Sequence, residues 1–355
     1  MNKILEFVQR FRSEITIGIV LLFIVSALIL ASVLGGFTRR GGEVITPQAT
    51  STEPTALLVP RRLDGMLVTR EEADVAPMAV MIENHPDARP LSGLSKARVV
   101  IEAPVEGGIP RFVAFFDATT TIGEIGPVRS ARPYFVDWVD GWNASYFHVG
   151  GSQEALQKIT ELGSFVDVNE FAYGGTVFWR DRRRAAPHNV YTSTELMTAI
   201  LARKGVATST MPIAWHFKDA VTSTERGIVN RINVPYGGSY NVTWRFVTST
   251  GEYVRSQNGN GPQVDRDGSV VAAENVIVMK TDARVLDDVG RLRLRTVGSG
   301  EALAYRDGEK FIIRWSRAAG ESIRFAGTGG NEFLLTRGRT WIEVVTDDRI
   351  FAGLE

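Results

Sequence analysis

Residues 97–118 read ARVVIEAPVEGGIPRFVAFFDA, and this stretch holds two short apolar runs on either side of Gly107 and Gly108. Runs rich in β-branched and aromatic residues, bounded by glycine and proline, are typical of strands. MAVMIEN before the stretch and ASYFHVGG after it have the same character, whereas SQEALQKITEL and TSTELMTAILARKG carry apolar residues at helical spacing. Residues 61–210 are therefore predicted to form a layered α/β domain around a largely central sheet.

The two predicted helices carry signals at both ends. Ser152 can cap the first helix and Gly163 can end it. Thr192 and Glu195 form a T-x-x-E capping box for the second, which Gly205 closes. Helices set between buried strands support the α/β interpretation, although the pattern does not reveal the order of the strands.

After about Met211 the pattern changes to alternating or β-branched runs separated by Gly, Asp and Asn turns. Such a pattern predicts hairpins, so residues 211–355 are expected to form a second, mainly antiparallel β-rich domain. Its RLRLR run places Arg291, Arg293 and Arg295 on one strand face. Because the chain is neutral and no aromatic residue is interleaved, this face is interpreted as solvated rather than as a groove for a polyanion.

The composition narrows the classes of function. The chain has 355 residues, enough for two domains, and its 40 basic and 40 acidic residues cancel, so no nucleic-acid partner is predicted. The absence of cysteine excludes disulfides, thiolate metal sites, cysteine nucleophiles and a lipoprotein signal. The nucleotide fingerprints G-x-x-x-x-G-K-[ST] and G-x-G-x-x-G do not occur, and no cofactor is predicted.

The N-terminus predicts attachment to a membrane. From Ile15 to Thr38 there are 24 residues without a charge, and about 20 apolar residues suffice for a helix to cross a bilayer. Residues 1–14 are interpreted as a cytoplasmic tail, 15–37 as an uncleaved transmembrane signal anchor in contact with the lipid bilayer, and 38–60 as a flexible linker. A cleaved signal peptide is the alternative, but its apolar region is usually only about 7 to 15 residues. The protein is thus expected in the cell membrane, single-pass, with its bulk extracytoplasmic.

Residues 126–138, GPVRSARPYFVDW, are the first candidate site. Pro133 suits the first position of a helix and Ser130 can cap it, so Arg129 and Arg132 would flank a helix N-terminus. Two guanidinium groups beside such an end could bind a phosphate or carboxylate. In the competing interpretation, both arginines pair with internal carboxylates such as Glu102, Glu106 or Asp137.

A glycine turn is the second candidate. In YFHVGGSQEAL a strand ending near His148 runs through Gly150 and Gly151 into a helix that begins at Ser152, which is an arrangement able to cradle an anion. Because G-x-S-x-G is absent, Ser152 is interpreted as a helix cap rather than a nucleophile.

Histidines at the ends of predicted elements are the third candidate. His85, His148 and His188, with Asn189 beside the last, lie in polar segments where α/β folds gather their sites, and imidazoles carry protons near neutral pH. A metal held by these three histidines and a carboxylate is an alternative, but neither H-x-x-x-H nor H-E-x-x-H spacing occurs, so no metal is predicted. His216 is interpreted as structural.

These same segments resemble the YerB family of bacterial envelope lipoproteins, a domain family without a known function. AVMIENHPDARPLSGLSKARVVIEAPVEGGIPRFVAFF, IGPVRSARPYFVDW, YFHVGGSQEAL and APHNVYTS carry the resemblance in the first half, and NVIVM and TWIEVV are among the segments that carry it in the second. The resemblance implies an N-terminal and a C-terminal family domain outside the membrane over about residues 61–355. It transfers no catalytic residues.

Two functions follow from the residues. The first is an extracytoplasmic protein that binds an anionic envelope ligand, such as a glycan carboxylate or phosphate, through Arg129 and Arg132. The second is an envelope hydrolase or transferase in which His148 or His188 is the acid or base and Glu102 or Glu106 its partner. Enzyme activity is left open between them.

Overall fold

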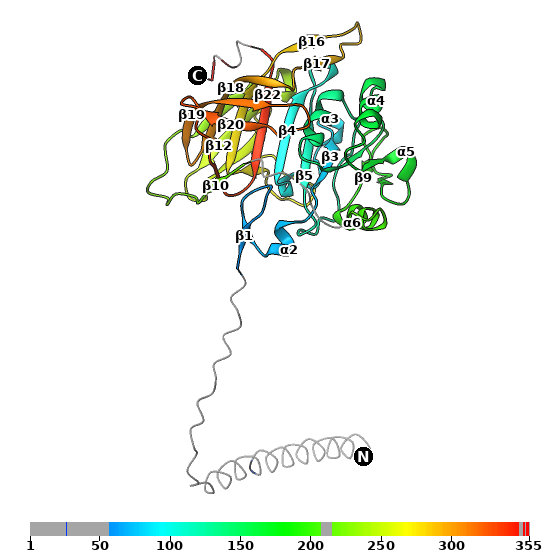
Figure 1. Cartoon of the computed structure of the whole chain (residues 1–355), viewed down its shortest axis with the longest axis horizontal. Coiled ribbons are helices and arrows are strands. Elements are labelled where there is room, and N and C mark those ends of the chain that lie inside the picture. Colours follow the sequence, from blue (N-terminus) through cyan, green and yellow to red (C-terminus); the bar gives the residue numbers. More distant parts are fainter. Residues whose placement is uncertain (1–25, 27–56, 207–214, 348–350, 352, 355) are drawn as a thin grey trace, which may run out of the picture. The chain divides into compact units, whose positions relative to one another are not determined.

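The computed structural model describes residues 26, 57–206, 215–347, 351 and 353–354. The predicted tail 1–14, nearly all of the anchor 15–37 and most of the linker 38–60 lie outside these residues. Within the described part of the chain, no helix is long and apolar enough to cross a membrane. Ala56–Glu355 form one compact unit (Figure 1).

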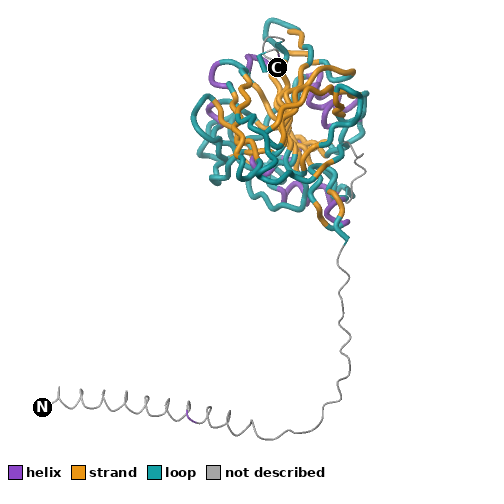
Figure 2. The backbone as a smooth tube through the Cα atoms, turned by 90° about the vertical axis from the view of Figure 1, so that its left-hand side faces the viewer, coloured by secondary structure: helices purple, strands orange, loops and turns teal. Residues whose placement is uncertain are grey.

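A ten-stranded mixed sheet runs through this unit (Figure 2). Its strands stand in the order β20 (Arg324–Gly327), β19 (Glu309–Arg317), β18 (Gly298–Arg306), β15 (Asn275–Lys280), β22 (Thr340–Val345), β4 (Val99–Pro104), β5 (Pro110–Phe116), β3 (Met78–Ile82), β6 (Ser145–His148) and β7 (Asp167–Asn169). The four strands predicted in the first half are β3, β4, β5 and β6. Their burial on both faces agrees with the predicted central sheet.

The two predicted domains meet inside this sheet. Strand β22 lies between β15 and β4 and pairs with both in parallel, with Glu343 in register with Glu102. The first half supplies five neighbouring strands on one side of this junction and the second half supplies the other five. The predicted boundary at residues 210 and 211 lies outside the described residues.

Different layers cover the two faces of the sheet. Helices α3 (Pro133–Asp140) and α4 (Gln153–Leu162) pack on one face, where Phe135 and Ile159 join Phe115 in the core. The other face is covered by a four-stranded antiparallel sheet, β11 (Arg231–Val234), β12 (Val242–Val247), β13 (Glu252–Gln257) and β14 (Ala272–Ala273), and by α6 (Thr194–Arg203). There Trp244 and Met197 join the core.

Short elements complete the unit. Two helical turns and four pairs of strands lie outside the main sheets: α2 (Arg70–Ala73) and α5 (Glu170–Tyr173), β1 (Val59–Pro60) with β2 (Leu67–Val68), β8 (Trp179–Arg180) with β9 (Val190–Tyr191), β10 (Phe217–Lys218) with β21 (Leu335–Thr336), and β16 (Ala283–Val285) with β17 (Leu292–Leu294). The 3-10 turns are η1 (Pro86–Ala88), η2 (Leu94–Lys96), η3 (Glu106–Gly108) and η4 (Gly238–Tyr240). The fold is thus mixed α/β, with a sheet-rich second half as predicted.

Candidate functional site

Three parallel strands end at one edge of the main sheet. Strand β6 pairs in parallel with both β3 and β7, so the residues that follow each strand gather there. The segment from Val128 to Ala131 crosses this edge, because the Arg129 N–H donates to the Met81 carbonyl at 2.9 Å and the Ala131 N–H donates to that of Gly150 at 3.0 Å. In α/β folds, ligands bind where parallel strands end.

The guanidinium group of Arg132 is paired with groups of the chain itself. Its Nε donates to Glu106 Oε2 at 2.9 Å, its Nη2 donates to Oε1 of the same carboxylate, and its Nη1 donates to the Ala131 carbonyl at 2.7 Å. For Arg132, this bidentate pairing agrees with the competing interpretation of the sequence, in which the arginine pairs with an internal carboxylate. Arg132 is also the N-cap residue of α3, with Pro133 at the first helical position as predicted.

Ser130 does not cap α3, contrary to the prediction. Arg132 is the N-cap residue, and the helix has no side-chain cap. Ser130 lies two residues before it, next to the bridge between Ala131 and Gly151. The Ser130 carbonyl instead accepts a hydrogen bond from Arg111 Nη1 at 2.7 Å.

Only one of the three guanidinium nitrogens of Arg129 has a hydrogen-bond partner among the described residues. Its Nε donates to Glu83 Oε1 at 3.0 Å, while neither terminal nitrogen has a hydrogen-bond partner among the described residues. The other oxygen of the same carboxylate, Oε2, lies 2.8 Å from His188 Nδ1. Glu83 therefore joins Arg129 to His188, and its side chain is only 6% exposed.

Arg111 lies beside Arg129 and has no carboxylate partner in the described part of the chain. It is the charged residue in the otherwise apolar strand β5, it is 7% exposed, and its one described hydrogen bond goes to the Ser130 carbonyl. Burial, and then the neighbouring charge of Arg129, lower the pKa of Arg111 to about 10. Near Arg111, the hydroxyl of Tyr146 is buried without a described partner, and burial raises the pKa of this tyrosine well above its usual range.

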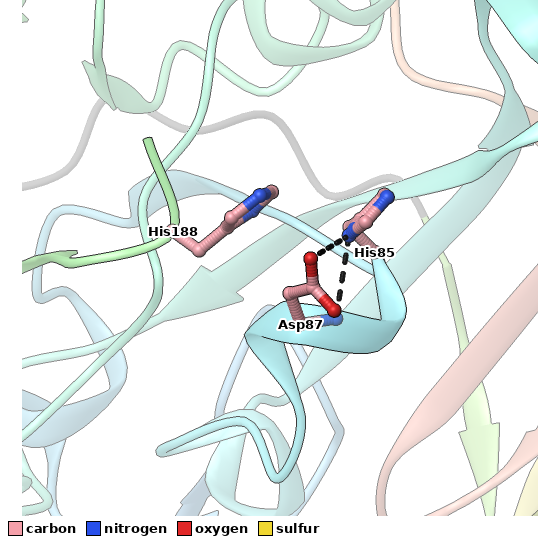
Figure 3. A group of neighbouring side chains, drawn as sticks. All are labelled: His85, Asp87 and His188. Atoms are coloured by element: carbon pink, nitrogen blue, oxygen red, sulfur yellow. Dashed lines mark hydrogen bonds and ion pairs between the residues drawn. The ribbon is translucent and has the colours of Figure 1, made fainter. Parts of the chain in front are cut away.

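His85 and His188 stack on each other at the same edge. Their ring centroids are 4.7 Å apart and their planes differ by 16°. Asp87 lies next to both rings, with Oδ2 3.6 Å from His85 Nδ1 (Figure 3). His85 precedes the turn η1 and its Nδ1 accepts the Asp87 N–H at 3.3 Å. Two predicted histidines are thus brought together, although they are more than 100 residues apart in the chain.

His148 is buried and has a partner of the chain itself at each ring nitrogen. It is completely buried, with Nδ1 2.7 Å from the Gly150 carbonyl and Nε2 2.7 Å from Asp167 Oδ1. Both ring nitrogens therefore face acceptors of the chain itself. The acid–base role of His148 therefore stays a prediction, for a side chain that strand β6 buries completely.

Glu102 is held away from these histidines by a buried ion pair. Arg255 Nη2 donates to both of its carboxylate oxygens, at 2.9 and 2.8 Å, and both side chains are fully buried. Neither predicted carboxylate contacts a histidine, since Glu106 is held by Arg132. The predicted histidine partners were therefore wrong, and Glu83 takes that position instead.

Two N–H groups of the glycine turn are bonded within the chain. The Gly150 N–H donates to Asn169 Oδ1 at 2.9 Å and the Ser152 N–H to the Ala131 carbonyl at 3.3 Å, so the predicted anion cradle is partly occupied from within. Ser152 caps α4 as predicted, accepting the Ala155 N–H at 3.2 Å. Asn189 organises its own loop, since its Nδ2 donates to the carbonyls of Asp181 and Arg184.

A cavity of about 410 Å³ lies between helices α3 and α4 and the β16–β17 hairpin. Arg132 and Ser152 line it together with Arg291 and Arg293 from the RLRLR run. Arg291 pairs with Asp287 and Glu154, and Lys158 in the same wall pairs with Asp137. Its charges are therefore mostly neutralised from within, and the cavity is a weaker anion site than the sheet edge. His216 lies elsewhere, paired with Glu332 at 2.8 Å.

Sequence reasoning missed Glu83, Asp87 and Arg111. Glu83 and Asp87 stand in the MIENHPD segment on either side of His85, directly after a buried strand. Arg111 is the first residue of the apolar run RFVAFFDA. A charged residue in a strand that is buried on both faces is costly, and this is the signal that could have identified Arg111.

Comparison with known proteins identifies both halves of the chain. Residues 63–207 match the domain described as "Protein of unknown function (DUF3048) N-terminal domain", and residues 232–342 match the corresponding C-terminal domain. "Putative lipoprotein YerB" of Bacillus subtilis (strain 168) is 31% identical over 306 residues, which cover 84% of this chain and 90% of that protein. The crystal structure of YerB from Bacillus subtilis matches with a TM-score of 0.72 at 30% identity, over 83% of this chain and 98% of that chain.

Proposed function

Since the chain belongs to the YerB-like family, whose two halves are the DUF3048 N- and C-terminal domains, we propose that it binds an anionic group of the cell envelope at Arg129 and Arg111. One observation carries this proposal. Arg111 is buried beside Arg129 without a carboxylate of its own, so this edge of the sheet holds more positive charge than the described residues neutralise. A buried guanidinium without an anion is costly, and a bound phosphate or carboxylate would compensate it.

The ligand class follows from the donors. The two terminal nitrogens of Arg129 can form the paired hydrogen bonds that suit a planar carboxylate or a phosphate. Tyr146 adds a buried hydroxyl near Arg111. Glycan carboxylates and phosphates are the groups of this kind that an envelope offers, and Arg132 is left out of the site because Glu106 saturates it.

Binding of inorganic phosphate and of glucuronate to the full chain in detergent, measured by calorimetry, tests the proposal. We expect Arg129→Gln and Arg111→Met to weaken binding by about 10- to 100-fold, the range for losing one charge-assisted hydrogen-bonding group. Arg132→Gln is the matched control, because its guanidinium already lies on Glu106. Equal weakening by all three substitutions, or no binding of either anion to the wild type, would contradict the proposal.

Attachment to the membrane is part of the same proposal. The matched relative is named "Putative lipoprotein YerB", whereas this chain has no cysteine to lipidate, so residues 15–37 would hold it at the membrane instead. Protease added to intact cells should then degrade the unit Ala56–Glu355. Protection of that unit until the membrane is opened would reverse the proposed orientation.

A hydrolase or transferase is the second candidate, and the Glu83–His188 contact favours it. A carboxylate 2.8 Å from Nδ1 orients an imidazole so that Nε2 can accept a proton, and Arg129 on the same carboxylate could stabilise developing negative charge. Mass spectrometry of envelope glycan fragments incubated with the wild type and with His188→Gln tests this. Turnover that the substitution abolishes would support it, and unchanged fragments with the wild type would remove it.

A further inference from the structure

We propose that His85, Asp87 and His188 bind a divalent transition-metal ion, with Glu83 as the outer carboxylate that fixes His188. This inference goes beyond the proposed function, because the anion would be bound by Arg129 and Arg111 whereas the metal would be bound by the two imidazoles and Asp87, and Glu83 contacts both groups. The sequence spacing gave no sign of such a site, since its ligands come from two segments about 100 residues apart.

The three side chains lie close enough together to share one ion after they rotate. Each offers one ligand atom, and these atoms all lie within 4.8 Å of one another (Figure 3). A zinc ion about 2.0–2.1 Å from each ligand would draw them to about 3.4 Å apart in tetrahedral geometry. Side-chain rotation can supply this difference, because the side chain of Asp87 is 72% exposed and that of His85 is 35% exposed.

The hydrogen bonds prepare the imidazoles to bind a cation. Glu83 Oε2 can only accept from His188 Nδ1, so Nδ1 carries the hydrogen and Nε2 presents its lone pair. Metal-binding histidines almost always donate their second N–H to a carboxylate or carbonyl in this way. His85 Nδ1 accepts the Asp87 N–H, so this nitrogen is unprotonated, and a metal bound there would replace that hydrogen bond.

The surrounding loops hold the two histidines in place. Arg184 donates from Nη1 to the Ala88 carbonyl and from Nη2 to that of Pro90, at 2.6 Å, which fastens the loop carrying His188 to the turn that follows His85. Arg129 in turn fixes Glu83. The stacked rings therefore belong to a braced arrangement rather than to two independent surface side chains.

The donor set indicates the class of metal. Two imidazoles and one carboxylate suit Zn²⁺, Co²⁺, Ni²⁺ or Fe²⁺, whereas Mg²⁺ and Ca²⁺ prefer oxygen ligands. Three protein ligands leave at least one coordination position for water or another group. The partly exposed Asp87 and His85 leave this position open to solvent.

Metal binding to the untagged full chain in detergent tests the inference. After treatment with a chelator, the protein is titrated with Zn²⁺ by calorimetry and with Co²⁺ by visible absorption, where bound Co²⁺ reports its ligand field. We expect one ion per chain. His85→Ala and Asp87→Ala should each weaken binding at least 100-fold, and Glu83→Gln should weaken it about 10- to 100-fold, as loss of an outer-shell partner does.

His216→Ala is the matched control, because it removes a histidine paired with Glu332 and should leave metal binding unchanged. Asp87 is exposed, so its substitution keeps the test valid if a histidine variant fails to fold. The inference is overturned if the wild type binds no ion, or if His85→Ala and Asp87→Ala bind as tightly as the wild type. Metal binding that persists in Arg129→Gln, with loss of phosphate binding, would separate this site from the anion site.

Discussion

At the scale of single residues, Glu102 and Glu343 face each other in register on the neighbouring strands β4 and β22, and both are completely buried. One cation, Arg255, reaches Glu102. Burial, and then the charge of Glu102, raise the pKa of Glu343 well above its usual range. Glu343 also accepts hydrogen bonds from Trp244 Nε1 at 2.8 Å and from the Tyr236 hydroxyl at 2.9 Å. One carboxylate balances the arginine, and the other is favoured in its neutral form.

Glu343→Gln should therefore flatten the dependence of stability on pH. A carboxyl group whose pKa is raised by folding stabilises the folded state below its unfolded pKa of about 4.3, and this contribution is lost as pH rises toward the folded pKa. A glutamine cannot ionise, so the variant should lose less stability than the wild type from about pH 4 upward. Chemical denaturation across pH 4–8 measures this difference. Glu195→Gln, at an exposed position on α6, is the control, and parallel curves for Glu343→Gln and the wild type would contradict the prediction.

Arg111→Met should stabilise the protein while weakening anion binding. The substitution deletes a buried charge that has no carboxylate partner and replaces it with an apolar side chain of similar length. We expect the melting temperature of the ligand-free chain to rise, whereas Arg132→Met should lower it by breaking the pair with Glu106. A fall in melting temperature for both variants would show that Arg111 is structural.

The sequence predicted the residues of the site better than their pairings. His85, His188 and Arg129 were all candidates, because polar residues beside strand ends are visible in the pattern. The contacts of Glu83 with Arg129 and His188 depend on which strands are neighbours. That order is set by long-range pairing, so the local pattern could not supply it.

At the scale of elements, tertiary contacts move the cap of α6 one residue away from the position that the local sequence predicts. Ser193, not Thr192, caps α6 and accepts the Leu196 N–H at 3.2 Å. Thr192 is displaced from this role because its hydroxyl donates to the Val177 carbonyl at 2.8 Å and its backbone bridges Ile125. The strands and helices themselves were predicted well, since periodicity is a property of each segment alone.

Ser152→Ala should destabilise α4 without affecting the sheet-edge site. The serine hydroxyl satisfies the Ala155 N–H, and losing such a cap costs about 0.5–2 kcal/mol. Ser152→Asp should restore most of the loss, because aspartate also caps and complements the helix dipole. Denaturant unfolding measures both variants, and phosphate affinity should match the wild type in each. Weaker phosphate binding in Ser152→Asp would place the anion near α4 rather than near Arg129.

At the scale of the whole molecule, contacts between the two halves of the sequence hold the folded unit together. Neither half alone predicts these contacts. The last strand of the main sheet along the chain, β22, is also the one that contacts the first half through β4. The Glu102–Arg255 pair links β4 to the four-stranded sheet formed by the second half. Two family domains along the sequence therefore coexist with one compact unit in space.

Fragments 57–206 and 215–355 should consequently fail to fold separately and should assemble when they are produced together. Alone, the first fragment would expose the edge of β4, whose residues are almost all buried, and would leave Glu102 without Arg255. An unpaired apolar edge favours aggregation. Size-exclusion chromatography and circular dichroism of each fragment, and of the co-expressed pair, measure the outcome.

The control is the intact chain cut after folding at a protease site introduced within residues 207–214, which should stay assembled because β4 and β22 remain paired. A monomeric first fragment that unfolds cooperatively would show instead that the halves are independent domains joined at a dispensable strand pair.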